Sequence, residues 1–317
     1  MTLTKTVSIA LAGSLLTLAA LAQPAAAPDA RTRAVRMTAQ RASSCRALGD
    51  FYWEIGNRDR PLATGQVGGQ FGADSAIAIA SASKWVFGAY VLERIGRPPS
   101  AGEIEALSMR SGYVSFRPLV CAFAGTVQGC FDRGGNSEFT GADVGKFSYG
   151  GGHDQKLAID LGLGGLTRQS LAAEIRRVLG NDLDLSYATP DLAGGVRTSP
   201  GTYGRFLRKI LRGELRIASY LGAPSFCTLP AACSDAVHSP IDLAWHYGLN
   251  YWIEDDPTGD GAFSSAGAFG FYPWIAADRG TYGLLARHSF AHDAAEASAI
   301  CGQHLRRAWA TGRAQLD

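Results

Sequence analysis

A serine and a lysine separated by two residues are the first combination in this chain that could do chemistry. Residues 81–84 read Ser81-Ala82-Ser83-Lys84, an S-x-x-K sequence. In a helical first turn, positions i and i+3 share a face, so the Ser81 hydroxyl can touch the Lys84 amine. A serine hydroxyl attacks an acyl carbon only when a base takes its proton, and a desolvated lysine can be that base. The motif also occurs by chance, in which case Ser81 would only cap a helix.

A tyrosine in a glycine-rich stretch could supply a second proton-transfer group. Residues 146–153 read KFSYGGGH, which places Tyr149 directly before three glycines. A phenol held near a lysine can lose or return a proton, as acyl transfer requires. A single tyrosine in a loop is more often structural, so Tyr149 alone is a weak indication.

The elements around these residues can be predicted from periodicity. Apolar residues recur at helical spacing over 84–95, and Gly96 followed by two prolines ends the run, so we expect Ser81 at the start of a helix. Further helices are predicted at 167–179, 202–211 and about 293–309. Strand signals lie at 50–55, 75–79, 248–253 and 280–286. Strands at both ends with helices between them predict one sheet completed by the N- and C-terminal segments, with a helical lobe inserted.

This layout divides the chain into two lobes. Residues 45–95 and 241–317 are expected to form an α/β lobe, and residues 96–240 a helical lobe. The arrangement brings the two ends of the folded chain together. Residues 23–44 are rich in Ala, Arg and Pro without apolar periodicity, and we predict a flexible N-terminus of the mature protein there.

The first 22 residues have the order of a secretory signal peptide. Lys5 is followed by an apolar run from Val7 to Ala22 and then by small residues. No later segment offers the roughly 18 uninterrupted apolar residues of a spanning helix, so no membrane span is expected. The sequence therefore predicts an exported protein, either periplasmic or secreted.

Six cysteines follow the predicted signal peptide. An even number in an exported protein favours disulfides over metal binding or redox catalysis. Short spacing favours Cys121 with Cys130 and Cys227 with Cys233, which leaves Cys45 for Cys301. The alternative is that some of the six are free buried thiols.

Composition excludes several classes of function. The formal charge of +2 comes from scattered arginines, whereas nucleic acid requires a clustered basic face. Neither H-E-x-x-H nor paired C-x-x-C occurs, and the six histidines are scattered, which argues against a metal. The G-x-S-x-G turn of α/β-hydrolases is also missing. No cofactor is implied.

Several segments together resemble the penicillin-recognising, serine β-lactamase-like family of class C β-lactamases, DD-peptidases and esterases. They occur in the family's order, and the resemblance covers roughly residues 50–310. The matching segments are Ser81 to Lys84, Tyr149, 191–207 and 264–271. The resemblance implies a β-lactamase/transpeptidase-like fold of the α+β type, with a mostly antiparallel sheet flanked by helices and an inserted helical subdomain.

The resemblance also implies a role for each matching residue. Ser81 would be the nucleophile that is acylated, Lys84 its base and Tyr149 the partner acid–base. The backbone N–H groups of Ser81 and Ala268 would form the oxyanion hole. The implied substrate-binding positions are Gly151, Ser265, Ala266, Gly267 and Phe269.

Two departures from the family pattern bear on the substrate. Gly151 stands where the second motif ends in Asn, so the amide that contacts a substrate amide is missing. The third motif, usually Lys or His followed by Thr-Gly, reads Ser265-Ala266-Gly267. The cation and hydroxyl that bind a carboxylate are therefore missing, which weakens binding of an anionic substrate by about 1.5–3 kcal/mol.

The sequence therefore predicts a serine hydrolase that cleaves a carboxylic ester or amide, in a small molecule or a polymer, through an acyl-enzyme on Ser81. One alternative is a DD-peptidase or β-lactamase that takes its cation from Arg197 or Arg287. Another is a β-lactamase-like protein that binds a ligand without catalysis. Aromatic residues crowd the motifs, and we expect most of them in the core rather than along an apolar cleft. They are Trp85, Tyr247, Tyr251, Trp252, Phe269, Phe271, Tyr272 and Trp274.

Overall fold

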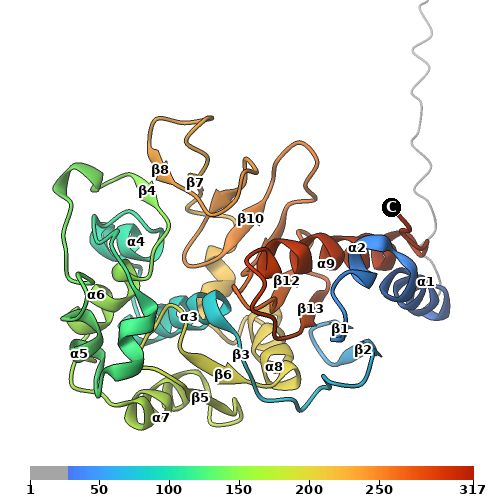
Figure 1. The fold of residues 1–317 in the computed structure, drawn as a ribbon, viewed down its shortest axis with the longest axis horizontal. Helices are drawn as coiled ribbons and strands as arrows, with labels where there is room; N and C mark the ends of the chain where they lie inside the picture. The colour runs from blue at the N-terminus through green and yellow to red at the C-terminus, as the bar shows by residue number, and fades with distance from the viewer. Residues whose placement is uncertain (1–27) are drawn as a thin grey trace, which may run out of the picture.

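The computed structural model describes residues 28–317 and is built on an eight-stranded antiparallel sheet (Figure 1). Its strand order is β2-β1-β13-β12-β11-β10-β9-β7. The strands are β1 (Phe51–Gly56), β2 (Pro61–Val67), β7 (Phe226–Cys227), β9 (His246–Tyr247), β10 (Trp252–Glu254), β11 (Ala262–Ser264), β12 (Tyr272–Ile275) and β13 (Tyr282–Ala286). N-terminal β1 pairs with C-terminal β13, so segments from both ends complete the sheet, as predicted. The predicted signal peptide lies outside the described residues.

Two terminal helices cover one face of the sheet. α1 (Pro28–Arg41) lies beside α9 (Ala294–Thr311), and the short α2 (Ser43–Arg46) follows α1 (Figure 1). The prediction of a flexible segment over residues 23–44 is therefore wrong for residues 28–44. Small side chains on one face of α1, among them Ala34, Val35 and Ala39, are buried in the core that includes Trp53 and Trp274. Such small residues among arginines give only a weak apolar periodicity.

The other face of the sheet is covered by α3 (Ser83–Ile95) and α8 (Pro200–Leu211). Trp85 of α3 and Phe206 of α8 are buried in one core cluster with Tyr282 and Leu284 of β13. α8 contacts β1 and β13, and β7 belongs to the main sheet, although both lie within the segment 96–240. The helical lobe thus contributes one strand and one covering helix to the sheet.

The remaining elements, most of them in segment 96–240, are short helices, 3-10 turns and two small sheets. The helices are α4 (Ala101–Leu107), α5 (Val127–Phe131), α6 (Gly152–Asp160) and α7 (Arg168–Leu179). The 3-10 turns are η1 (Ala80–Ala82), η2 (Pro118–Phe123), η3 (Gly141–Asp143) and η4 (Arg216–Tyr220). The small sheets combine β3 (Ile77–Ala78) with β6 (Val196–Thr198) and β5 (Leu185–Tyr187), and β4 (Phe147–Ser148) with β8 (Ala236–His238). The first small sheet joins the strand before Ser81 to segment 191–198.

Three disulfides hold the fold, and they join the two cysteine pairs favoured from short spacing and the pair that remained. Cys45 of α2 is bonded to Cys301 of α9, with their Cα atoms 4.9 Å apart. Cys121 is bonded to Cys130, and Cys227 to Cys233. The first bridge ties α2, which directly follows α1, to α9 and so joins segments from the two ends of the chain. Across residues 28–317, no helix has both the length and the apolar character to cross a membrane.

Candidate active site

A tight turn brings Ser81 and Lys84 together. Ala80 has a left-handed φ of 44°, which is unusual for a residue with a side chain and turns the chain sharply from β3 into η1. Lys84 then lies in the first turn of α3. Its Nζ donates a hydrogen bond of 3.1 Å to Ser81 Oγ and one of 3.2 Å to the carbonyl oxygen of Ala193. The lysine is only 4% exposed, so these contacts take the place of water.

Tyr149 lies against the same lysine. Lys84 Nζ is 4.7 Å from the centroid of the Tyr149 ring. The ring is stacked on Trp252, with centroids 5.3 Å apart, and stands edge-on to Tyr247 at 5.9 Å. These aromatic neighbours fix the plane of the ring beside the amine.

The backbone before Tyr149 is held by a buried histidine. His153 Nδ1 accepts the Ser111 N–H at 3.2 Å, so its Nε2 carries the proton and donates to the Ser148 carbonyl at 2.9 Å. Burial, reinforced by the charge of Lys84, lowers the pKa of His153 to about 4, so the ring is neutral at pH 7. His153 therefore positions Tyr149 through the backbone.

Two buried carboxyl groups surround Lys84, and sequence reasoning missed both. Burial raises the pKa of Asp154 to about 7, although Lys84 and a 2.8 Å hydrogen bond from Asn250 lower it. Burial also raises the pKa of Asp191, against the opposing effects of Lys84 and of the N–H groups of Ala193 and Gly194. Asp154 Oδ2 and Asn250 Oδ1 are buried without a hydrogen-bond partner among the described residues. No motif marks Asp154, and Asp191 only begins the matching segment 191–207, because the perturbed environment of both carboxyls arises when folding removes them from water.

These residues open onto a cleft of about 560 Å³. Six of the predicted site residues line it, namely Ser81, Lys84, Tyr149, Gly151, Ala268 and Phe269. The sequence analysis did not identify the wall formed by Phe116, Pro118, Leu119 and Ala122. Among the described residues, Lys84 and Asp191 are the only charged side chains in the lining.

None of the predicted substrate-binding residues Ser265, Ala266 and Gly267 lines this cleft, so their role in binding stays a prediction. The buried Ser265 donates its hydroxyl to the Ser81 carbonyl oxygen at 3.3 Å. A Cβ on Gly267 would overlap the carbonyl oxygen of Ile79, so this glycine lets the loop after β11 approach the turn before Ser81. Both residues therefore support the turn that carries Ser81.

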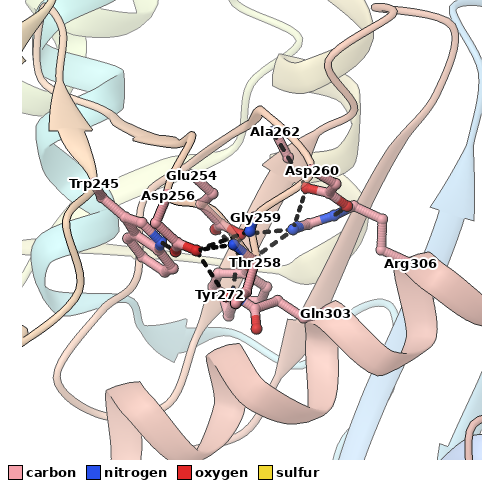
Figure 2. A network of polar contacts seen from close by, with 10 residues as sticks. All are labelled: Trp245, Glu254, Asp256, Thr258, Gly259, Asp260, Ala262, Tyr272, Gln303 and Arg306. Atoms are coloured by element: carbon pink, nitrogen blue, oxygen red, sulfur yellow. Dashed lines mark hydrogen bonds and ion pairs between the residues drawn. The ribbon is translucent and has the colours of Figure 1, made fainter.

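Ala266 faces a different cavity, of about 370 Å³, between α9 and the end of the sheet at β10 and β11. The polar groups of that region form a paired network, shown in Figure 2. Arg306 contacts Glu254 at 2.6 Å and Asp260 at 2.7 Å. Ala266 thus points away from Ser81.

The glycine at position 151 is explained by its neighbour. A Cβ on Gly151 would lie 2.5 Å from Cδ1 of Phe116 and 3.0 Å from the Cβ of Ala193. An asparagine, which the family pattern has here, would meet the Phe116 ring. The cleft therefore presents an aromatic face where the resemblance would place an amide.

The arginines and aromatic residues considered from the sequence lie mostly elsewhere. Arg287 is buried and donates to Ser298 Oγ and to the carbonyls of Leu48 and Ala294, while Arg197 donates to the Ala76 carbonyl. Neither arginine lines the cleft.

Of the eight aromatic residues that crowd the motifs, only Phe269 lines the cleft, as expected from the assignment of most of them to the core. The other seven, Trp85, Tyr247, Tyr251, Trp252, Phe271, Tyr272 and Trp274, are buried. Within residues 28–317, no group of three or more His, Cys, Asp or Glu could hold a metal ion.

Solved structures share this fold at low sequence identity. A hydrolase with promiscuous acyltransferase activity, EstCE1, is 10% identical with a TM-score of 0.65, over 89% of this chain and 99% of its own. A D-stereospecific amidohydrolase from Streptomyces sp. is 12% identical with a TM-score of 0.58, over 86% of this chain and 98% of its own. A β-lactamase from Mycobacterium bovis is 14% identical with a TM-score of 0.54, over 82% of this chain and 95% of its own. No family model and no curated protein matches the chain by sequence. The likeness is one of fold, and it confirms the fold predicted from the motifs.

Proposed function

We propose that this chain, which has the serine β-lactamase-like fold, is an exported serine hydrolase that cleaves a neutral carboxylic ester or amide through an acyl-enzyme on Ser81. The observation that carries the proposal is the 3.1 Å contact between Lys84 Nζ and Ser81 Oγ in the lining of a cleft of about 560 Å³. A nucleophile within hydrogen-bond reach of a buried base is the arrangement that activates a serine.

Acylation follows from this contact. In this step, the Ser81 hydroxyl gives its proton to the lone pair of Lys84 Nζ while Oγ bonds to the carbonyl carbon of the substrate. The resulting oxyanion is stabilised by the backbone N–H groups of Ser81 and Ala268, and each such donor is worth on the order of 10²-fold to 10³-fold in rate. The bond to the leaving alcohol or amine then breaks, and the leaving group takes up the proton through Lys84 or Tyr149.

Deacylation repeats these steps with water. Water attacks the acyl carbon, and its proton passes to Lys84 or Tyr149. The bond to Ser81 Oγ breaks, the acid leaves, and Oγ recovers a proton. Tyr149, whose ring centroid is 4.7 Å from Lys84 Nζ, is the second group through which this proton can pass.

The electrostatics of the cleft favour a neutral substrate. Lys84 is the only cationic side chain among the described lining residues, and it faces the buried carboxyls Asp154 and Asp191. The two arginines that could have replaced the missing cation of the third motif do not line the cleft. A carboxylate on the substrate would therefore lack a partner, which argues against a DD-peptidase or β-lactamase.

Export is supported by the signal-like N-terminal sequence and by the disulfides. Three disulfides are formed within the described residues. Disulfides persist in oxidising compartments such as the periplasm or the exterior of the cell. The names of two structural neighbours, an amidohydrolase and a hydrolase with acyltransferase activity, support acyl transfer as the chemistry.

The test is hydrolysis of p-nitrophenyl acetate, an anilide analogue and nitrocefin by the exported form. We expect ester or anilide turnover that falls at least about 10³-fold in Ser81→Ala, as removal of an activated nucleophile does. Ser186→Ala, on the exposed face of β5, is the matched control and should retain activity. A phosphonate ester should add one covalent mass at Ser81.

Each other outcome points to a specific alternative. Undiminished turnover in Ser81→Ala would contradict the proposal. Rapid nitrocefin loss would favour a β-lactamase. Absence of any turnover, together with a ligand that Ser81→Ala binds as tightly as the unaltered chain, would indicate a binding protein.

A further inference from the structure

The wall of the cleft near Gly151 carries exposed apolar side chains. Leu119 of η2 is 84% exposed and lines the cleft together with Ala122. In a 3-10 helix, residues i and i+3 lie directly above one another, so Leu119 and Ala122 share one face. Phe123 is 80% exposed on the same turn but does not line the cleft. The turn therefore directs one defined apolar face toward Ser81.

A second apolar group lies at the same cleft. Phe269 lines it and packs against His288, with ring centroids 4.8 Å apart, and against Phe290 at 5.5 Å. Phe290 is 82% exposed. Burial lowers the pKa of His288, with a further contribution from Arg197, which favours its neutral form. This aromatic group continues the cleft lining to the surface.

The wall at η2 is held in place rather than loosely attached. Cys121 is bonded to Cys130, and both are fully buried. The buried Asn136 accepts the Arg117 N–H at 2.6 Å and donates to the Cys130 carbonyl at 3.0 Å. A rigid backbone lowers the entropy lost when a ligand covers exposed apolar side chains, and this is the advantage of a preorganised site.

We infer that Phe116, Leu119, Phe269 and Phe290 bind an apolar chain attached to the scissile ester or amide, so that medium-chain esters are the preferred substrate class. The inference rests on the proposed function of Ser81, and it adds the recognition element. Its strongest support is continuity, because three of the four residues line the same cleft as Ser81, and the fourth packs on Phe269. Exposed apolar residues gathered at one cleft mark a binding surface.

The test is a series of p-nitrophenyl esters from acetate to octanoate, held below their aggregation limits. Burial of a methylene gains up to about 4-fold in binding, and we expect kcat/KM to rise about 2- to 4-fold per methylene. A parallel series of acetate esters from ethyl to octyl distinguishes a chain on the acyl side from one on the alcohol side.

Leu119→Ser and Phe290→Ser are the informative variants, since both side chains are exposed and their loss should not disturb folding. We expect the octanoate-to-acetate ratio of kcat/KM to fall about 5- to 20-fold in each. Phe123→Ser is the matched control, on the same turn and almost as exposed as Leu119, and should keep the ratio. Flat chain-length dependence in both the acyl and the alcohol series, an unchanged ratio in Leu119→Ser for the series that shows the preference, or an equal fall in Phe123→Ser would overturn the inference.

A binding measurement separates failure of this inference from failure of the proposed function. Titration calorimetry of methyl octanoate and methyl acetate with Ser81→Ala needs no turnover. Tighter binding of the octanoate that is lost on adding Leu119→Ser supports the apolar site even if no ester is hydrolysed. Turnover of acetate with no preference for octanoate in either assay leaves the hydrolase proposal standing and refutes the apolar site.

Discussion

The ring of Phe116 occupies the space in which a side chain at Gly151 would begin. A Cβ at that glycine would be 2.5 Å from the ring and 3.0 Å from the Cβ of Ala193. The missing amide of the second motif and the apolar wall of the cleft are therefore one structural feature. A contact that would suit a polar substrate is replaced by one that suits an apolar substrate.

Adding the family's asparagine should reveal this coupling. Gly151→Asn should lower the free energy of unfolding by about 1–3 kcal/mol, because the new side chain overpacks against Phe116. The double variant Gly151→Asn with Phe116→Ala should lose less than the sum of the two single changes. Urea unfolding of the four proteins gives the coupling energy. Gly165→Asn, where an added Cβ meets nothing within 4 Å, is the control, and additive effects at 151 and 116 would contradict the packing argument.

Removing the base should stop chemistry without unfolding the protein. Lys84→Met keeps the length of the buried side chain but cannot take the Ser81 proton, so kcat on the best ester should fall about 10²- to 10⁴-fold. Lys156→Met, which removes a surface lysine paired with Asp160, should retain activity. Stopped-flow acylation of both variants makes the comparison. Equal rates in the two variants would show that Lys84 is not the base.

The phenol and the ring of Tyr149 should have separable roles. Tyr149→Phe keeps the stacking on Trp252 and should lower kcat about 10²-fold through loss of proton transfer, with little change in stability. Tyr149→Leu also removes the stacked ring and should cost stability in addition. Thermal unfolding and ester kinetics on both variants check this. A loss of activity confined to the leucine variant would mean that only the ring matters.

Asp154 should make stability depend on pH between about 4 and 7. Burial raises its pKa from 3.8 to about 7 in the folded protein, so the folded state keeps a proton that the unfolded chain releases above pH 3.8. The contribution of the Asp154 carboxyl to stability is complete below pH 3.8 and is lost as the pH rises through about 7. Relative to Asp154→Asn, the unaltered chain should therefore lose up to about 3 kcal/mol of unfolding free energy from pH 5 to pH 8.

Urea titrations at pH 5 and pH 8 measure this difference. Asp160→Asn, at the exposed end of the same helix, should follow the unaltered chain at both pH values. The same pH dependence in Asp154→Asn as in the unaltered chain would show that this carboxyl does not titrate there.

The bridge between the chain ends should be the most stabilising of the three disulfides. Cys45 and Cys301 are 256 residues apart, whereas Cys121 and Cys130 are 9 apart. Loop-closure entropy in the unfolded state gives about 5 kcal/mol for the long loop and about 3 kcal/mol for the short one. Paired Cys→Ser variants, compared by urea unfolding, should follow that order. A larger loss from the short loop would mean that its local packing around Asn136 dominates.

Several features of this protein could be predicted because they are local in sequence. The S-x-x-K spacing places Ser81 and Lys84 on one face of a turn, and the helix after it follows from apolar periodicity over a dozen residues. Short spacing indicated two disulfide pairs, and the even number of cysteines left Cys45 and Cys301 as the third. The fold followed from motifs in a fixed order. In each case, the information lies within one element or in the order of elements.

Other features depended on which distant segments pack together. Lys84 donates a hydrogen bond to the carbonyl oxygen of Ala193, which is 109 residues away in sequence. Asp154 accepts one from Asn250, which is 96 residues away. The Ser265-Ala266-Gly267 segment has the place of a binding motif in the sequence. In the structure, Ser265 donates a hydrogen bond to the Ser81 carbonyl oxygen, and Ala266 lines the cavity beside α9. Periodicity cannot specify such contacts, because the burial of a group and its electrostatic environment arise only when distant segments of the chain pack together. The sequence alone predicted that Ser81 and Lys84 lie together as candidate nucleophile and base, and the tertiary structure decided the electrostatics around them and the apolar wall of the cleft.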